Sequence, residues 1–161
     1  MNKGLILGRF QPFHLGHLAL IKNIITDHLD PLICIGSSQK ERTIENPFTK
    51  GERRKMIESV LETLECNYEI YEIPDINNYD LYVSHLTKIV PSFDVVYSGN
   101  ALVKRLFTEA GHKVIVPQMV NRLVWEGSSI RQDIIKNGDW EKDVPKTVAK
   151  IISNIELERL E

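Results

Sequence analysis

Short apolar runs alternate with amphipathic stretches along most of the chain, and this alternation restricts the possible folds more than any other feature. Strands that alternate with helices are joined by right-handed crossovers into a parallel sheet. We therefore expect an α/β fold, in which a doubly wound parallel sheet has five core strands in the order 3-2-1-4-5. The expected strands are Lys3–Gly8, Pro31–Gly36, Tyr68–Ile73, Phe93–Ser98 and Lys113–Val116. The expected helices between them cover about residues 15–28, 51–65, 79–90 and 100–110.

The length of 161 residues fits one domain of ordinary size. No repeat, low-complexity segment or linker divides the sequence. We expect a single domain over residues 1–161, with C-terminal helices from about residue 128. One of these helices is expected to begin at Ser128 and end near Gly138, and another to begin around Pro145. The helix over 51–65 has its own start signal, a Thr-x-x-Glu capping box at Thr49–Glu52.

Composition excludes several classes of protein. A formal net charge of −2 argues against non-specific nucleic-acid binding, which needs an excess of basic residues. No apolar stretch is long enough to span a bilayer, and no signal-peptide pattern opens the chain. Cys34 and Cys66 belong to no Cys-x-x-Cys pair, which disfavours a disulfide framework or a structural zinc site. The expected location is the reducing cytoplasm.

The segment Gly8–His17 directly follows the first apolar run and reads Gly-Arg-Phe-Gln-Pro-Phe-His-Leu-Gly-His. Its two histidines, His14 and His17, fall on one face of the first turn of the expected helix. The free backbone N–H groups of such a turn carry partial positive charge and suit an anion, above all a polyphosphate. The two rings would add side-chain donors where phosphate charge changes during a reaction.

The histidine pair allows three interpretations. The rings can be ordinary surface or cap residues, they can ligate a metal, or they can donate to phosphate oxygens. No third cysteine, histidine or carboxylate stands at a suitable spacing for a metal. The preceding strand and the small residue Gly16, which lets a ligand approach closely, favour the phosphate interpretation.

The segment Ser128–Arg131 is a second candidate anion site. Ser128 can cap the expected helix, and Arg131 then lies over the same turn. A helix N-terminus combined with a guanidinium group binds anions well. The alternative leaves Ser128 as a cap only and Arg131 as an exposed salt-bridge residue.

The expected topology brings two unusual loops together. Ligands of doubly wound sheets bind outside the carboxyl ends of the strands, where the strand order reverses. The first strand ends in Gly8–Pro12 and the fourth in Ser98–Asn100, so these loops should lie side by side. The dinucleotide fingerprint Gly-x-Gly-x-x-Gly, the P-loop and the Gly-x-Ser-x-Gly elbow are all missing from the sequence.

Together, the two motifs resemble the nucleotidylyltransferase superfamily with its HxGH and ISSTxxR signatures. The similarity is closer still to the archaeal-type nicotinamide-mononucleotide adenylyltransferases, and it covers nearly the whole chain in order. HxGH alone identifies only the superfamily, whereas the longer strings are more specific. The supporting segments are Gly36–Gln39, Asn46–Arg53, Pro74–Asn77, Tyr97–Asn100, Trp140–Glu141 and Val144–Pro145.

The resemblance implies a Rossmann-like nucleotidylyltransferase fold and a reaction of NAD biosynthesis. ATP and nicotinamide mononucleotide would give NAD and pyrophosphate, with Mg²⁺ held through the phosphates rather than by a protein metal site. No tightly bound organic cofactor, nucleic acid or membrane is implied. The family often forms hexamers, so a homo-oligomer is expected.

The resemblance also assigns roles to individual residues. The catalytic residues it implies are His14, His17 and Arg131. The residues implied in ATP binding are Gly8, Arg9, Phe10, Gln11, Gly16, Gly99, Asn100, Ser128, Ser129 and Arg131. The residues implied in binding the mononucleotide are Ser37, Asp75, Ile76, Tyr79 and Tyr82.

The sequence departs from the family pattern at a few positions. Tyr82 stands where the family often has Trp, Tyr79 where it has an amide, and Ser128 where it has Thr. Glu45 replaces a common basic residue, and Arg42 replaces a frequent His. Either Arg42 or Lys40 takes over the phosphate contact of the basic residue by a shift of the loop, or that contact is missing. Tyr79 and Tyr82 can also form a stripe that faces the core, and the basic run Lys50–Lys55 can simply be solvated.

Two other functions compete with this one. A sibling enzyme would adenylate phosphopantetheine or a flavin nucleotide, or cytidylylate a phosphoalcohol, but the segments Asn46–Thr49 and Pro74–Ile76 argue against it. A non-catalytic nucleotide-binding regulator would be expected to have a damaged HxGH motif or to lack Arg131, and both are intact.

Overall fold

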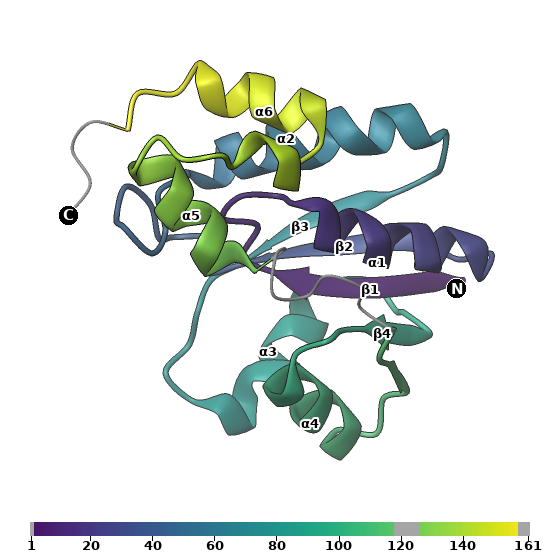
Figure 1. The fold of residues 1–161 in the computed structure, drawn as a ribbon. Helices are drawn as coiled ribbons and strands as arrows, with labels where there is room; N and C mark the ends of the chain where they lie inside the picture. Colours follow the sequence, from purple (N-terminus) through teal and green to yellow (C-terminus); the bar gives the residue numbers. More distant parts are fainter. Residues whose placement is uncertain (1, 118–125, 158–161) are drawn as a thin grey trace.

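A computed structural model describes residues 2–117 and 126–157 of the chain. Its centre is a parallel sheet of five strands in the order β3-β2-β1-β4-β5, which confirms the predicted topology (Figure 1). Leu5 of β1 pairs with Leu32 of β2 on one side and with Val96 of β4 on the other. The strands are β1 (Lys3–Gly8), β2 (Asp30–Gly36), β3 (Glu69–Ile73), β4 (Val95–Tyr97) and β5 (Val114–Ile115).

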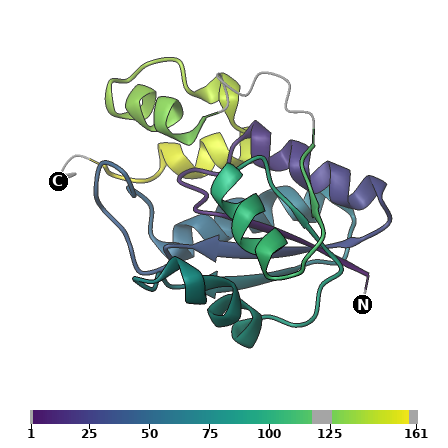
Figure 2. The ribbon, with the colours of Figure 1, turned by 90° about the horizontal axis from the view of Figure 1, so that it is seen from below.

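Helices cover both faces of the sheet, as the alternating sequence pattern predicts. One face carries α1 (Leu15–Thr26), α2 (Lys50–Leu61), α5 (Gly127–Ile135) and α6 (Lys146–Ser153) (Figure 1). The other face carries α3 (Tyr82–Ile89) and α4 (Ala101–Glu109), and Figure 2 shows the same arrangement from below. Short 3₁₀ turns occupy Glu62–Leu64, Tyr79–Leu81 and Glu141–Asp143.

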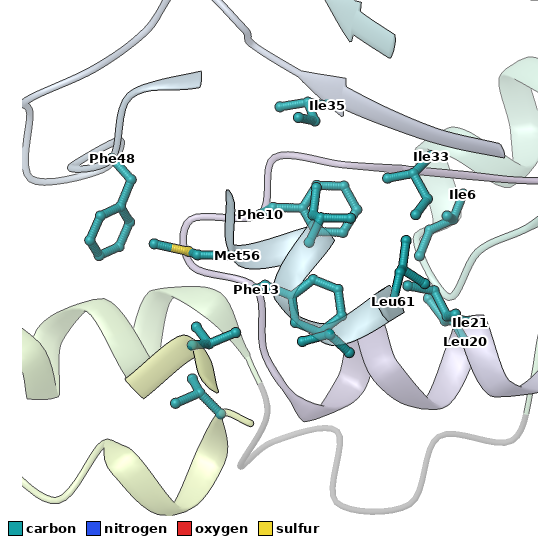
Figure 3. Packing of buried hydrophobic residues seen from close by; sticks show 14 of the residues in the cluster. Ile6, Phe10, Phe13, Leu20, Ile21, Ile33, Ile35, Phe48, Met56 and Leu61 are labelled. Atoms are coloured by element: carbon teal, nitrogen blue, oxygen red, sulfur yellow. The ribbon is translucent and has the colours of Figure 1, made fainter. Parts of the chain in front are cut away.

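Successive residues of the central strands point to two separate cores. Leu5, Leu32 and Cys34 pack under α3 and α4, whereas Ile6, Ile33 and Ile35 pack under the helices of the opposite face. All six side chains are at most 1% exposed. Figure 3 shows that Phe10 and Phe13, from the loop after β1, lie within the second of these cores. The loop that carries the histidine motif is therefore anchored by two buried rings.

The strand boundaries differ from the expectation most at β4 and β5, which are shorter than predicted. Phe93 lies outside β4 and packs with Phe107 and His112 instead. The Asp94 carboxylate accepts a hydrogen bond from the backbone N–H of Lys3, at 2.9 Å. The backbone N–H of Asp94 also donates to the carbonyl oxygen of Lys3 at 2.9 Å, so this residue stays tied to β1 although the strand begins at Val95.

The predicted start of α2 is confirmed, and that of α5 is corrected. Thr49 Oγ1 accepts from the N–H of Glu52 at 3.1 Å, and Glu52 Oε1 accepts from the N–H of Thr49 at 2.9 Å. In α5, however, the N-cap is Glu126 and makes no side-chain capping bond, so Ser128 is the second helical residue rather than the cap. The helix begins earlier because Gly127 already adopts helical geometry. Of the predicted helical stretch after Val116, residues 118–125 lie outside the described residues.

Within the described ranges, no helix is both long enough and apolar enough to cross a membrane.

Candidate active site

The loop between β1 and α1 has an unusual shape that positions the histidines. Phe10 has a left-handed backbone, with φ of 54°, and the bond between Gln11 and Pro12 is cis. The buried ring of Phe10 lies 4.4 Å from the ring of His17, and that of Phe13 lies 5.5 Å from it. Two apolar rings therefore support the imidazole of His17 from the core side.

His14 and His17 form a capping box at the start of α1. His14 is the N-cap, and its Nδ1 accepts from the N–H of Gly16 at 3.0 Å. The Nδ1 of His17 accepts from the N–H of His14 at 3.1 Å. Because both Nδ1 atoms accept, each neutral ring must carry its proton on Nε2. The two rings stack with centroids 3.8 Å apart.

Burial keeps both imidazoles neutral. Burial, followed by the charge of the nearby Arg131 guanidinium, lowers the pKa of His14 to about 4. Burial, followed by the neighbouring His14, holds the pKa of His17 well below its usual 6.5. The pair is therefore suited to donate hydrogen bonds to anionic oxygens rather than to exchange protons near pH 7.

Arg131 joins the late motif to the early one. Its Nη1 donates to the carbonyl oxygen of Gln11 at 2.9 Å, across a separation of 120 residues. The side chain is 9% exposed, and burial lowers its pKa to about 10, so the guanidinium stays charged at neutral pH. The charge of Arg9 acts in the same direction and that of Glu45 opposes it. The two predicted anion motifs thus lie together, with the Arg131 guanidinium close to His14.

Two residues of the early motif have structural tasks that the sequence did not reveal. The amide of Gln11 exchanges two hydrogen bonds with the backbone of Phe48, at 2.9 and 2.8 Å, and is only 2% exposed. The N–H of Gly16 is taken by His14 and is therefore not free for a ligand. Fewer backbone N–H groups are therefore free at this helix start than expected, and the imidazole N–H groups remain as donors for a ligand.

The loops after β1 and β4 border one cavity, as predicted. The cavity has a volume of about 380 Å³ and opens at the carboxyl ends of β1 and β2. Asn100 borders it and caps α4, since its Oδ1 accepts from the N–H groups of Leu102 and Val103. The other lining residues include Gly8, Arg9, Ser37, Asp75, Tyr79 and Tyr82.

A second cavity, of about 440 Å³, adjoins the first along the loop after β3 and shares four of its residues, Ser37, Asp75, Tyr79 and Tyr82. Lys40 and the segment Ile76–Asn78 line the rest. All five residues predicted for mononucleotide binding therefore line this cavity. Asp75 accepts from Ser37 Oγ at 3.1 Å and forms an ion pair with Lys40 at 3.4 Å.

Tyr79 and Tyr82 differ in their surroundings. Tyr79 is 64% exposed at the rim, which argues against a stripe facing the core. Tyr82 is half-buried against the α3–α4 core, and burial raises its pKa to about 12. Of these two tyrosines, Tyr82 is therefore the better candidate to offer a fixed ring to a ligand, because its ring packs against the core.

Arg53 is the functional candidate that the sequence pattern did not single out. It belongs to the basic run that was expected to be solvated, yet it is 0% exposed. Its helical register was a usable signal, because it lies on the same face of α2 as the buried residues Met56, Ile57 and Val60. Its guanidinium donates only to backbone carbonyl oxygens, including those of Arg9 and Gly36 at 3.0 Å each.

Among the described residues, no group of three or more histidine, cysteine, aspartate or glutamate side chains is placed to hold a metal ion. Ser128 and Ser129 are exposed at the start of α5, on the turn that carries Arg131.

Comparisons with known proteins show the family of this chain. Residues 5–133 match the family described as Cytidylyltransferase-like. The nicotinamide-nucleotide adenylyltransferase of Thermoplasma volcanium is 46% identical over 156 residues, covering 96% of this chain and 88% of the relative. That of Picrophilus torridus is 44% identical over 155 residues, covering 96% and 92%. The chain belongs to the nicotinamide-nucleotide adenylyltransferase family.

Solved structures show that the family fold extends to more distant proteins. A bifunctional NMN adenylyltransferase/ADP ribose pyrophosphatase from Francisella tularensis, complexed with AMP and a manganese ion, superposes with a TM-score of 0.70. The match covers 94% of this chain, which spans about half of the Francisella chain (52%). The sequence identity is 20%, so this likeness carries the fold alone.

Arg42 and Lys40 are the two candidates for the basic residue that Glu45 replaces, and they have different partners in the structure. Arg42 makes a bidentate ion pair with Glu52, at 2.7 and 2.8 Å, and also donates to the carbonyl of Pro47. Lys40 instead lines the second cavity with about half of its side chain exposed. Lys40 is also ion-paired, with Asp75, but that single contact is longer, at 3.4 Å, than the bidentate pair of Arg42.

Proposed function

We propose that this protein transfers the adenylyl group of ATP to nicotinamide mononucleotide, giving NAD and pyrophosphate. One observation carries the proposal: the hydrogen bond from Arg131 to the Gln11 carbonyl brings the late cation to the paired histidines at the end of β1. Relatives more than 40% identical over nearly the whole chain carry the same activity in their names. The whole chain would act as one nucleotidylyltransferase domain.

The reaction needs charge stabilisation more than proton transfer. An oxygen of the mononucleotide 5′-phosphate attacks the α-phosphorus of ATP and forms a new P–O bond. The bond from the α-phosphorus to the bridging oxygen of the β-phosphate breaks, and pyrophosphate leaves with that electron pair. The attacking oxygen is already anionic, so no general base is required. Fixed donors and cations at the triphosphate are therefore what the enzyme must supply.

The neutral histidines and the arginines meet this need in different ways. The Nε2–H groups of His14 and His17 would donate to phosphate oxygens whose charge increases during transfer. Arg9 and Arg131 would hold the triphosphate as permanent cations, with Ser128 and Ser129 adding hydroxyl and N–H donors at the start of α5. Phe10, Gln11 and Gly16 would contribute by shaping the loop, since their side chains or N–H groups are already in use.

The two cavities divide naturally between the substrates. We assign the adenosine of ATP to the cavity side of Gly8 and Asn100, next in sequence to Gly99, which is not itself among the lining residues. We assign the mononucleotide to the cavity lined by Ser37, Asp75, Ile76, Tyr79 and Tyr82. Magnesium would reach the site with ATP, bound by phosphate oxygens and water, which suits a site without a cluster of protein ligands among the described residues. Its chemistry would be to offset triphosphate charge.

The test is an acceptor panel. The purified protein is incubated with ATP, Mg²⁺ and, separately, nicotinamide mononucleotide, its deamidated form, phosphopantetheine and flavin mononucleotide. We expect NAD and equimolar pyrophosphate with the first acceptor. Absence of NAD together with turnover of phosphopantetheine would assign the protein to a sibling activity. ATP binding without any turnover would favour a regulator.

We also propose that the protein works in the cytoplasm as a homo-oligomer, a hexamer as the family resemblance implies. Both cysteines are free thiols, which suits a reducing compartment. Ile44 and Ile135 are 51% and 46% exposed beside a hollow of about 570 Å³ that α6 also lines. Contacts between copies would cover such a surface. Sedimentation velocity of the wild-type protein gives the assembly state directly.

A further inference from the structure

Arg53 is a buried cation that has no carboxylate partner among the described residues. Its side chain is 0% exposed on the inner face of α2, and it is the largest of the fully buried side chains. In the described part of the chain, no carboxylate oxygen lies within 4.0 Å of its guanidinium nitrogens. Burial lowers its pKa to about 10, so the group remains charged at pH 7. A buried charge is expensive unless its hydrogen bonds are satisfied, so its surroundings need a specific explanation.

The explanation is a set of backbone carbonyl oxygens. Nη1 donates to Arg9 and Gly36 at 3.0 Å each, which are residues at the carboxyl ends of β1 and β2. The remaining bonds run from Nη2 to the carbonyls of Ser37, Ser38 and Lys40 (3.3, 3.2 and 3.2 Å) and from Nε to that of Thr49 (3.2 Å). The five N–H groups of a guanidinium are thus shared among six acceptors.

These carbonyls belong to two different halves of the proposed site. Arg9 begins the loop that leads to the histidines and the triphosphate cations. Ser37 and Lys40 line the cavity assigned to the mononucleotide. One planar side chain therefore connects the loop after β1 to the loop after β2, and these loops border the two proposed substrate positions.

We infer that Arg53 is a positioning residue for adenylyl transfer, which fixes the spacing of the two substrate sites without contacting either substrate. This inference rests on the proposed function for its kinetic consequence. When the hydrogen bonds of Arg53 are lost, the residues proposed to contact ATP and those proposed to contact the mononucleotide are still present. KM for each substrate should therefore change little. The attack distance between the two phosphates depends on the link, and a misplacement of about 1 Å can lower a rate about 10²-fold.

The test compares Arg53→Lys and Arg53→Met with matched changes at the adjacent Arg54, which is half-exposed and bonds to Ile70 and Glu72 on β3. Lysine keeps the charge but has three donors on one atom, so it cannot span carbonyls on both sides. We expect Arg53→Lys to fold and to lose kcat about 10²-fold, with each KM within about threefold of wild type. The Arg54 variants should keep the wild-type kcat.

Several results would overturn the inference. It fails if folded Arg53→Lys retains the wild-type kcat, or if KM rises as much as kcat falls. A lysine variant that does not fold would assign Arg53 to stability alone.

A second readout does not depend on catalysis and so separates this inference from the proposed function. Amide hydrogen exchange of the peptides over residues 9–11 and 36–41 should speed up in Arg53→Lys and not in Arg54→Lys. If the wild type makes no NAD, the proposed function fails while this measurement still tests the link. Unchanged exchange in both peptides would show that Arg53 does not hold these loops.

Discussion

At the scale of single residues, the histidine pair shows how one side chain can serve both fold and site. One nitrogen of each ring closes the helix start, and this fixes the other nitrogen as a donor. No hydroxyl or carboxylate at the same position could do both, because neither offers a rigid donor opposite its acceptor. The tautomer that phosphate binding needs is therefore set before any substrate arrives.

Replacing His17 should separate these two tasks. His17→Ala should lower kcat by about 10²–10³, by analogy with other donors to developing negative charge. His17→Gln keeps an acceptor at the third helical position, so it should restore the melting temperature but not the rate. Initial rates and thermal melts of both variants decide this, with the exposed residue His28 changed to Asn as the control. A wild-type kcat in folded His17→Ala would contradict the role.

The ring of Tyr82 should matter for only one substrate. It borders the mononucleotide cavity and is held by the α3–α4 core. Stacking contributes about 0.5–1.5 kcal/mol, so Tyr82→Ala should raise KM for the mononucleotide about two- to tenfold and leave KM for ATP nearly unchanged. Tyr82→Trp should be tolerated. Tyr68→Ala, which removes a half-buried ring from the other core, is the control. Equal rises in both KM values would make Tyr82 a core residue only.

At the scale of elements, the start of α5 positions Arg131, the cation that we propose for the triphosphate, by close packing. A Cβ atom built on Gly127 would lie 2.8 Å from Nη1 of Arg131. The end of an arginine side chain can move aside at little cost, but it would then leave the Gln11 carbonyl. Glycine at this position therefore serves the site rather than the helix.

Gly127→Ala should accordingly weaken ATP use without weakening the fold. Alanine favours the helix by about 0.4–1 kcal/mol, so the melting temperature should stay or rise. KM for ATP should rise about 10- to 100-fold, the equivalent of a lost hydrogen bond to a charged group of about 1.5–3 kcal/mol. Gly51→Ala, in the first turn of α2, meets only an ordinary contact at 3.9 Å and is the matched control. If both variants keep the wild-type KM, Arg131 does not bind the triphosphate.

The elements were the most predictable level of this protein. The strand order, the helices between the strands and the meeting of the loops after β1 and β4 all followed from hydrophobic alternation and crossover handedness. The false start at Ser128 arose because a serine before an apolar run resembles an N-cap, whereas α5 begins with glycine. Arg53 was missed because a charged residue in a basic run predicts solvent, and only its register with Met56 and Ile57 indicated burial. The tautomers of His14 and His17 could not be predicted from the sequence, because they follow from the hydrogen bonds that the two Nδ1 atoms accept in the fold.

At the scale of the whole molecule, burying neutral imidazoles links stability to pH. The pKa of His14 is about 4 in the fold and about 6.5 in an unfolded chain. The unfolded chain therefore binds more protons between these values, and stability that is present above pH 6.5 is lost as the pH falls towards 4. From pH 7 to 5, we expect this group to reduce the free energy of unfolding by about 2 kcal/mol.

Urea unfolding at pH 7 and pH 5 measures this effect. His14→Asn keeps a good N-cap without a titrating ring, so its stability should change less between the two pH values. The exposed residue His28 changed to Asn should leave the wild-type pH dependence intact. The same pH dependence in all three proteins would show that His14 titrates normally in the fold.

The hydrogen bond between Arg131 and Gln11 also has a consequence for the order of events during synthesis. All five strands are complete by Ile115, whereas α5 begins at Gly127. Domains form from the N-terminus as the chain leaves the ribosome, so the sheet and both histidines can be in place before the second cation exists. A nascent chain stalled after β5 would have the two histidines of the proposed nucleotide site but not Arg131. Activity would begin only once the last helices have emerged and closed against the first loop.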